Sequence, residues 1–121
     1  MAKTGDIAVL LEAGLRAESL RHRAIASNVA NLETPGYRRV DVKFEELLAK
    51  VLASRGTVDL REIAPQIHQP KSTPVKSNGN DVNLEAEVGE MVKNTLRHRA
   101  LVRLLNKKYS QIELAISTRQ R

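Results

Sequence analysis

Apolar residues between positions 82 and 117 recur at alternating steps of three and four, the spacing of a helix that buries one row of side chains against a partner helix. This row, termed the C-terminal seam, contains Val88, Met91, Thr95, His98, Val102, Leu105, Tyr109, Ile112 and Ile116. A second apolar row falls on roughly the opposite side and contains Leu96, Ala100, Leu104 and Leu114. At 1.5 Å per residue this helix would be about 50 Å long, so we expect it to pack lengthwise against neighbours on two sides.

The charges along this segment agree with a helix. Asn83 is a good N-cap residue, and the acidic residues Glu85, Glu87 and Glu90 occupy the first turns, where the helix dipole favours negative charge. We interpret these three acids as capping or solvated side chains. His98 lies in the seam and is expected to be packed or hydrogen-bonded rather than a metal ligand.

A first helix is predicted over residues 6–32. Its three–four row, termed the N-terminal seam, contains Leu10, Ala13, Ala17, Leu20 and Ala24. A second apolar row on the other side contains Leu11, Leu15, Ile25, Val29 and Leu32. Because alanines allow a neighbouring helix to approach closely, pairing of this helix with the C-terminal seam is the simplest use of one face. The two terminal helices then form a coiled-coil-like pair.

The first helix is expected to stop at residues 34–37, where Pro35 disfavours helical geometry at Thr34 and Gly36 suits the third position of a type II turn. Residues 41–53 predict a short amphipathic helix. Residues 54–81 contain prolines and an Asn-Gly pair and predict an irregular connector, with hints of extended structure at 57–60 and 62–63.

The predicted fold class is therefore all-α. The predicted organisation is a single structural unit of three parts: residues 1–53 with the first helix, the turn and the short helix, the connector at 54–81, and the long helix at 82–121.

Composition narrows the possible functions. The chain has 121 residues, 41% of them hydrophobic but only 2% aromatic, which fits long aliphatic helices better than a deep core. It has no cysteine, which excludes disulfides and thiolate chemistry. No apolar run reaches the length of a membrane span, and the N-terminus lacks the features of a secretory signal. If the protein leaves the cytoplasm, we expect it to use a route without cleavage of a conventional signal peptide.

The most specific motif is residues 27–37, SNVANLETPGY, which closely resembles the N-terminal signature of bacterial flagellar rod and hook proteins. Residues 80–87, NDVNLEAE, resemble the other boundary of this family, at the start of its C-terminal helix. The short length and the ending at residues 101–116 look most like the member that builds the proximal rod, with the sister rod protein FlgC as the alternative.

This resemblance implies a structural subunit that is exported unfolded by the flagellar type III apparatus and assembles helically near the base of a rod spanning the periplasm. The implied partners are copies of the chain, the rod proteins FlgC, FlgF and FlgG, and the basal-body adaptor FliE. The implied assembly motif consists of Ser27, Asn28, Asn31, Thr34, Pro35, Gly36 and Tyr37. We expect the asparagines to bond backbone or neighbouring subunits, although simple termination of the helix also explains these residues.

The sequence also bears on other functional classes. An enzyme is not predicted, because no Ser-His-Asp order, phosphate-binding glycine loop or metal-ligand spacing is present, and no cofactor, metal or small-molecule substrate is expected. The formal charge of +6 and a basic run between residues 91 and 112 permit nucleic-acid binding or generic helical oligomerisation as the alternative function. No nucleic-acid partner is predicted, because the basic residues share their helix with an apolar seam and no aromatic stacking platform accompanies them. They also permit a helix lying on a membrane surface, although the chain has no tryptophan and no direct insertion is predicted.

Overall fold

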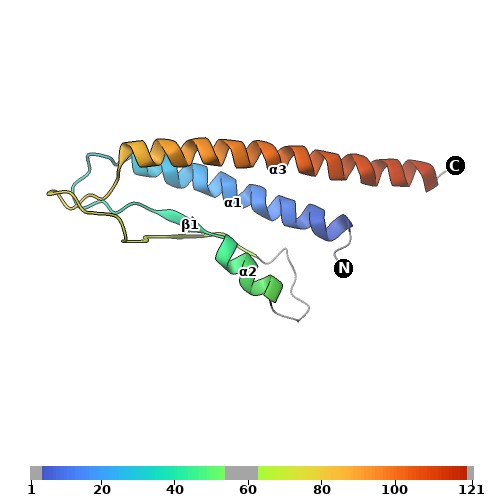
Figure 1. The fold of residues 1–121 in the computed structure, drawn as a ribbon, viewed down its shortest axis with the longest axis horizontal. Coiled ribbons are helices and arrows are strands. Elements are labelled where there is room, and N and C mark those ends of the chain that lie inside the picture. The colour runs from blue at the N-terminus through green and yellow to red at the C-terminus, as the bar shows by residue number, and fades with distance from the viewer. Residues whose placement is uncertain (1–3, 54–62, 120–121) are drawn as a thin grey trace.

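The computed structural model describes residues 4–53 and 63–119 and shows two long antiparallel helices with a short helix and a small sheet beside them (Figure 1). The elements are α1 (Thr4–Ala30), β1 (Asp41–Lys43), α2 (Glu45–Ala53), β2 (Gln66–His68) and α3 (Leu84–Arg119). The prediction of two long terminal helices that pack together is confirmed. None of the described helices has an apolar stretch sufficient to cross a membrane.

Small residues on α1 allow close packing on two of its sides. At Gly14, a Cβ atom would lie 3.3 Å from Cδ1 of Leu101, so α1 and α3 approach closely at this point. On another side, Ala13 and Ala17 are buried against Phe44 and Ile63, with Leu48 and Val51 of α2 packed around them. Therefore α1 is the central element, with α3 on one side and the layer around Phe44 on the other.

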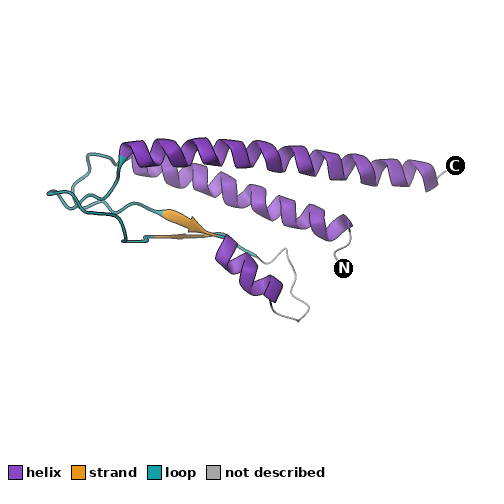
Figure 2. Cartoon of the chain, in the orientation of Figure 1, coloured by secondary structure: helices purple, strands orange, loops and turns teal. Residues whose placement is uncertain are grey.

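The prediction of one helix over residues 41–53 is wrong for its first residues. Residues 41–43 form β1, which pairs antiparallel with β2 in the register Asp41↔His68 and Val42↔Ile67 (Figure 2). Val42 and Phe44 are buried while Lys43 between them is exposed, the two-residue alternation of a strand. The two-stranded sheet is thus an addition to the predicted all-α fold. Residues 57–60 and Glu62, where extended structure was expected, lie outside the described residues, and Ile63 is buried.

The long helix α3 extends past the start of α1 (Figure 1). Its N-terminus is capped as predicted, because the Asn83 side-chain oxygen accepts the Ala86 N–H at 3.0 Å. Only Glu87, Asn94 and Leu105 of α3 are buried. Much of the helix surface is therefore available for contact with other chains.

Candidate assembly site

The turn after α1 has the predicted geometry. The Tyr37 N–H donates to the Thr34 carbonyl at 3.3 Å, and Gly36 has a φ of +74°, as the third position of a type II turn requires. Asn31 supports the turn from inside the chain, since its side-chain amide donates to the Ser27 carbonyl at 2.8 Å and its side-chain oxygen accepts from the Thr34 hydroxyl at 3.1 Å. The turn is thus fixed by its own local hydrogen bonds.

The segment that leads into α3 is bonded directly to this turn. The fully buried Asn80 side chain donates to the carbonyls of Asn31 and Thr34, both at 2.8 Å. The Gly36 N–H donates to the Asn78 carbonyl at 2.9 Å. Gly79 has a φ of +85°, and a Cβ there would lie 3.2 Å from the Cα of Gly36, so the two backbones approach closely. Residues distant in sequence therefore form one compact junction.

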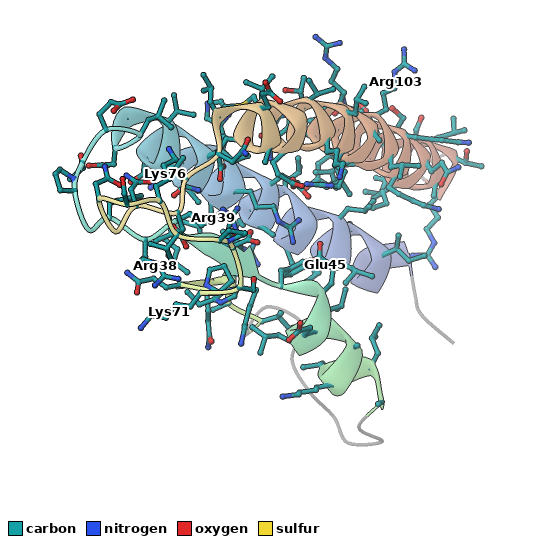
Figure 3. All side chains as sticks on the ribbon, turned by 60° about the vertical axis from the view of Figure 1, so that its left-hand side comes forward. Arg38, Arg39, Glu45, Lys71, Lys76 and Arg103 are labelled. Atoms are coloured by element: carbon teal, nitrogen blue, oxygen red, sulfur yellow. The ribbon has the colours of Figure 1, made fainter. Side chains whose placement is uncertain are left out.

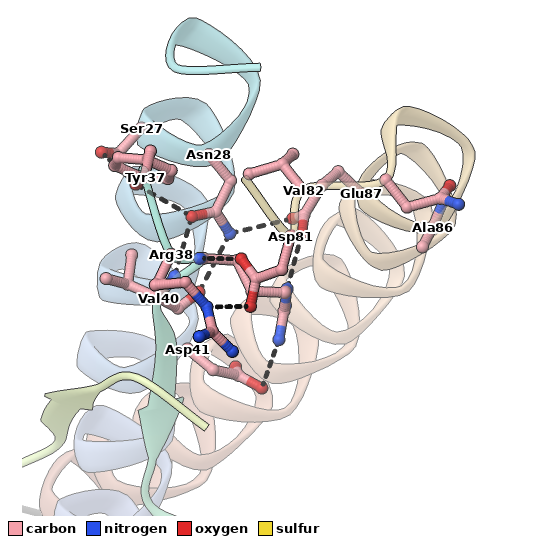
Figure 4. Close-up of polar contacts among 12 residues, drawn as sticks. Ser27, Asn28, Tyr37, Arg38, Val40, Asp41, Asp81, Val82, Ala86 and Glu87 are labelled. Carbon is pink, nitrogen blue, oxygen red and sulfur yellow. Dashed lines mark hydrogen bonds and ion pairs between the residues drawn. The ribbon is translucent and has the colours of Figure 1, made fainter. Parts of the chain in front are cut away.

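Asn28 lies at the centre of the junction and is completely buried (Figure 4). Its amide nitrogen donates to the Val40 carbonyl at 2.9 Å and to Oε2 of Glu87 at 3.1 Å. Its oxygen accepts the Val40 N–H at 2.9 Å and the Tyr37 hydroxyl at 3.1 Å. Because Asn28 is buried and bonded in this way, it binds backbone and side chains of its own chain in the isolated protein.

Two buried carboxylates complete the junction (Figure 4). Glu87 is 1% exposed and accepts the Arg39 Nε–H at 2.8 Å. Asp81 is 1% exposed and accepts the Arg38 Nε–H at 3.0 Å as well as the Arg39 backbone N–H. These bonds tie the chain after the turn to the start of α3 through charge-assisted contacts.

The charges of this junction shift the pKa values of its members. Burial alone raises the pKa of Asp81, but the hydrogen bonds from Arg39 and Arg38 and the charge of Arg38 outweigh it, so the net pKa is lowered. Burial lowers the pKa of Arg39, yet the hydrogen bond to Glu87 and the nearby carboxylates give a net rise. The junction thus favours the ionised forms of Asp81 and Arg39.

A second polar layer connects α1, α2 and α3 about halfway along the helix pair. Glu18 is buried and accepts from Arg21 at 2.6 Å, from Arg97 at 2.8 Å and from the Asn94 amide at 2.8 Å. Asn94 also donates to the Glu18 carbonyl at 2.7 Å. Arg21 extends the layer to Glu45 at the start of α2. This layer fixes how far α3 can slide along α1.

The structure brings the predicted assembly motif together at one end of the helix pair. Asn28 is buried, Asn31 and Tyr37 are half-buried, and Ser27, Thr34, Pro35 and Gly36 are exposed. In the N-terminal seam, Ala13, Ala17 and Ala24 are buried and Leu10 and Leu20 are half-buried. In the C-terminal seam, Leu105 is buried, Met91, Val102 and Ile112 are half-buried, and the exposed members are Val88, Thr95, His98, Tyr109 and Ile116.

The contact between α1 and α3 follows a row that differs from the C-terminal seam over its first half. Glu87, Asn94 and Leu101 of α3, spaced by seven, meet Asn28, Glu18 and Gly14 of α1. The expectation that Glu87 is a solvated or capping acid is wrong, because Glu87 is buried. His98 was expected to be packed or hydrogen-bonded rather than a metal ligand, and packing is wrong because His98 is exposed. A search for apolar rows misses Glu87, Asn94 and Glu18 because they are polar. The seven-residue spacing of Glu87, Asn94 and Leu101 is the signal that indicates them.

Within the described residues, no cluster of three or more acidic or histidine side chains is placed to hold a metal ion. Positively and negatively charged side chains are spread over the surface, and Arg103 projects from α3 far from Arg38 and Arg39 (Figure 3). The basic run on α3 is partly used inside the molecule, because Arg97 pairs with the buried Glu18.

Comparison with known proteins adds independent observations. Residues 11–38, which include most of α1 and the turn, match the family described as flagella basal body rod protein. The chain is similar to the flagellar basal body rod protein FlgB of Bacillus subtilis (strain 168), with 26% identity over 88% of this chain and 90% of the relative. It is also similar to FlgB of Aeromonas hydrophila, with 27% identity over 88% of this chain and 89% of the relative. FlgB of Cereibacter sphaeroides is similar too, with 29% identity over 85% of this chain and 91% of the relative. These comparisons give no support to the nucleic-acid-binding alternative.

Proposed function

We propose that the chain is a member of the flagellar basal body rod protein family, whose description residues 11–38 match and whose FlgB proteins are similar to most of the chain. On that premise it is a structural subunit of the proximal rod that assembles helically through α1 and α3. The observation that carries this proposal is the exposed apolar surface of α3. Val92, Leu96, Leu104 and Leu114 are all exposed, although they are large apolar side chains. Large apolar side chains exposed along one helix are typical of a surface that other proteins cover.

The junction around Asn28 has a positioning role in this proposal. Its buried ion pairs set the relative register of α1 and α3, so that both helices are presented as one rigid surface. The exposed members of the assembly motif, Ser27, Thr34, Pro35 and Gly36, lie at the outer edge of the junction. There they are accessible to a neighbouring subunit, and the turn directs the chain towards β1.

The remaining parts of the proposal come from the family resemblance. The partners are copies of the chain, the rod proteins FlgC, FlgF and FlgG, and the adaptor FliE. The rod lies across the periplasm, and the subunit is exported without cleavage of a signal peptide. The two seams contribute to packing within and between subunits, and residues 54–81 connect the two halves of a single structural unit.

Deletion of the gene from a motile host tests the function. We expect loss of swimming and absence of intact rods in images of basal bodies, with recovery when the wild-type gene is supplied. Intact rods and normal swimming after deletion would contradict the proposal.

A pair of variants locates the assembly surface. Leu104→Asp places a charge in the exposed apolar row and should abolish the recovery of swimming, since a buried unpaired carboxylate is costly at an interface. The matched control is Asn106→Asp, which adds the same charge at an exposed polar position two residues away. This control variant should still restore swimming. Equal swimming with both variants would show that the apolar row is not an assembly surface.

A further inference from the structure

A groove of about 460 Å³ runs between α1 and α3. It is lined by His22 and Arg23 of α1 and by Thr95, His98 and Arg99 of α3, with the Glu18 carboxylate beneath. These five residues are exposed, whereas Glu18 and Asn94, which also line the groove, are buried. Thr95 and His98, two of the exposed members of the C-terminal seam, therefore line this groove.

The rim of the groove is cationic. The Glu18 carboxylate is already paired with Arg21 and Arg97 and bonded to Asn94. Among the ion pairs of the described residues, neither Arg23 nor Arg99 has a carboxylate partner. The two guanidinium groups thus face solvent beside hydroxyl and imidazole groups, an arrangement that favours an acidic ligand surface.

The same chain has an acidic and apolar surface of complementary character at the start of α3. Glu85, Val88, Gly89 and Val92 fall on one side of this helix at 3.6 residues per turn, and all four are exposed. A Cβ atom added at Gly89 would meet nothing within 4 Å, so the surface is open and a second helix can approach its backbone closely. We term this the α3 entry surface.

We propose that the α3 entry surface of one copy docks into the groove lined by His22 and Arg99 of the next copy, with Glu85 facing the cations of the rim. The proposal rests on the proposed function and deepens it by assigning the two contact surfaces. A contact between two grooves would place their arginines opposite one another. A contact between the entry surface and the groove instead places Glu85 opposite the arginines. In the proposed contact each copy inserts its entry surface into the groove of one neighbour and receives the entry surface of another. Such a heterologous contact continues as a helix, whereas reciprocal docking of two copies would close as a dimer.

Cysteine cross-linking tests this contact directly, since the chain has no cysteine of its own. Val88→Cys marks the entry surface and Thr95→Cys marks the groove. Within one chain these positions are about 10 Å apart along α3, too far for a disulfide, which requires a Cβ–Cβ distance of about 4.5 Å or less. In a host that lacks the native gene, oxidation of rods built from the double variant should give a ladder of covalent multimers. A mixture of the two single variants should give dimers only.

Leu52→Cys combined with Thr95→Cys is the matched control and should give no ladder, because Leu52 is an exposed apolar residue on α2, as Val88 is on α3. Arg99→Glu in the double-cysteine background should lower the yield about fivefold or more, and the further change Glu85→Arg should restore it. Swimming before oxidation shows that the subunits fold and assemble. Swimming cells without a ladder, or dimers from one single variant alone, would overturn the inference and leave the function intact. Failure of the wild-type gene to restore swimming would instead overturn the function.

Discussion

At its start, α3 contributes Glu87 and Asn94 to buried hydrogen bonds with α1, whereas near its end Leu114 and Ile116 are 68% and 53% exposed. Polar groups are buried where α3 meets its own chain, and apolar groups face solvent where it extends past α1 (Figure 1).

The difference between the two ends has a physical meaning. Buried ion pairs contribute little net stability compared with apolar packing, but they disfavour every register in which a charge is left unpaired. Exposed apolar side chains have the opposite character, because they gain free energy when any suitable surface covers them. We therefore infer that the start of α3 specifies the fold of the single chain and that the end depends on neighbouring chains.

The largest expected effect is at the buried end. Glu87→Ala leaves the Arg39 guanidinium and the Asn28 amide without their partner, and removal of one member of a buried ion pair costs about 3–5 kcal/mol. Urea unfolding of the isolated chain, followed by circular dichroism, measures this change. Glu90→Ala on the next turn is the control, and it should change the free energy of unfolding by less than about 0.5 kcal/mol. Similar values for both variants would contradict the role of Glu87.

Asp81→Asn should have the next largest effect, about 2 kcal/mol near neutral pH, because hydrogen bonds to a charged group are lost. The folded-state pKa of Asp81 lies below its ordinary value of 3.8. Its contribution is therefore complete above that value and is lost as the pH falls through the folded-state pKa. The difference in unfolding free energy between wild type and variant should shrink below pH 3.8. A difference that stays constant down to pH 2 would contradict the ion pair with Arg38.

Gly36→Val should cost about 1–2 kcal/mol, because a β-branched residue is strained at a φ of +74°. A Cβ at this position meets no atom within 4 Å, so the cost is conformational and not a clash. We expect assembly into rods to be impaired more than export of the subunit into the medium. Pro35→Ala is a suitable comparison, since it leaves the glycine conformation free. Equal loss of export and assembly for Gly36→Val would count against a role of the turn in assembly.

The smallest effect on the single chain is expected at the exposed end. Leu114→Asp should change the unfolding free energy of the isolated protein by less than about 0.5 kcal/mol, since the side chain is already in solvent. The same variant should fail to restore swimming, because the charge would be buried between subunits. Loss of several kcal/mol in the isolated chain would show that the end of α3 is packed within the monomer.

Much of the fold follows from local sequence, but the junction does not. The three–four rows predict α1 and α3, and the Thr-Pro-Gly-Tyr turn and the Asn83 cap follow from residue chemistry. The strands β1 and β2 are too short for a periodic signal, and their pairing joins residues far apart in the chain. Glu18, Glu87 and Asn94 are polar and therefore belong to none of the apolar rows, although all three are buried. Their burial depends on arginine and asparagine partners that only the tertiary structure brings near.

Hydrogen exchange of backbone amides, measured in the isolated chain and in assembled rods, tests the difference between the two ends most directly. In the isolated chain we expect slow exchange for residues 87–101, the part of α3 that packs alongside α1. We expect fast exchange for residues 110–119. In assembled rods both segments should exchange slowly. Slow exchange of residues 110–119 in the dilute isolated chain would contradict the account, because the end of α3 would then be ordered without any neighbour.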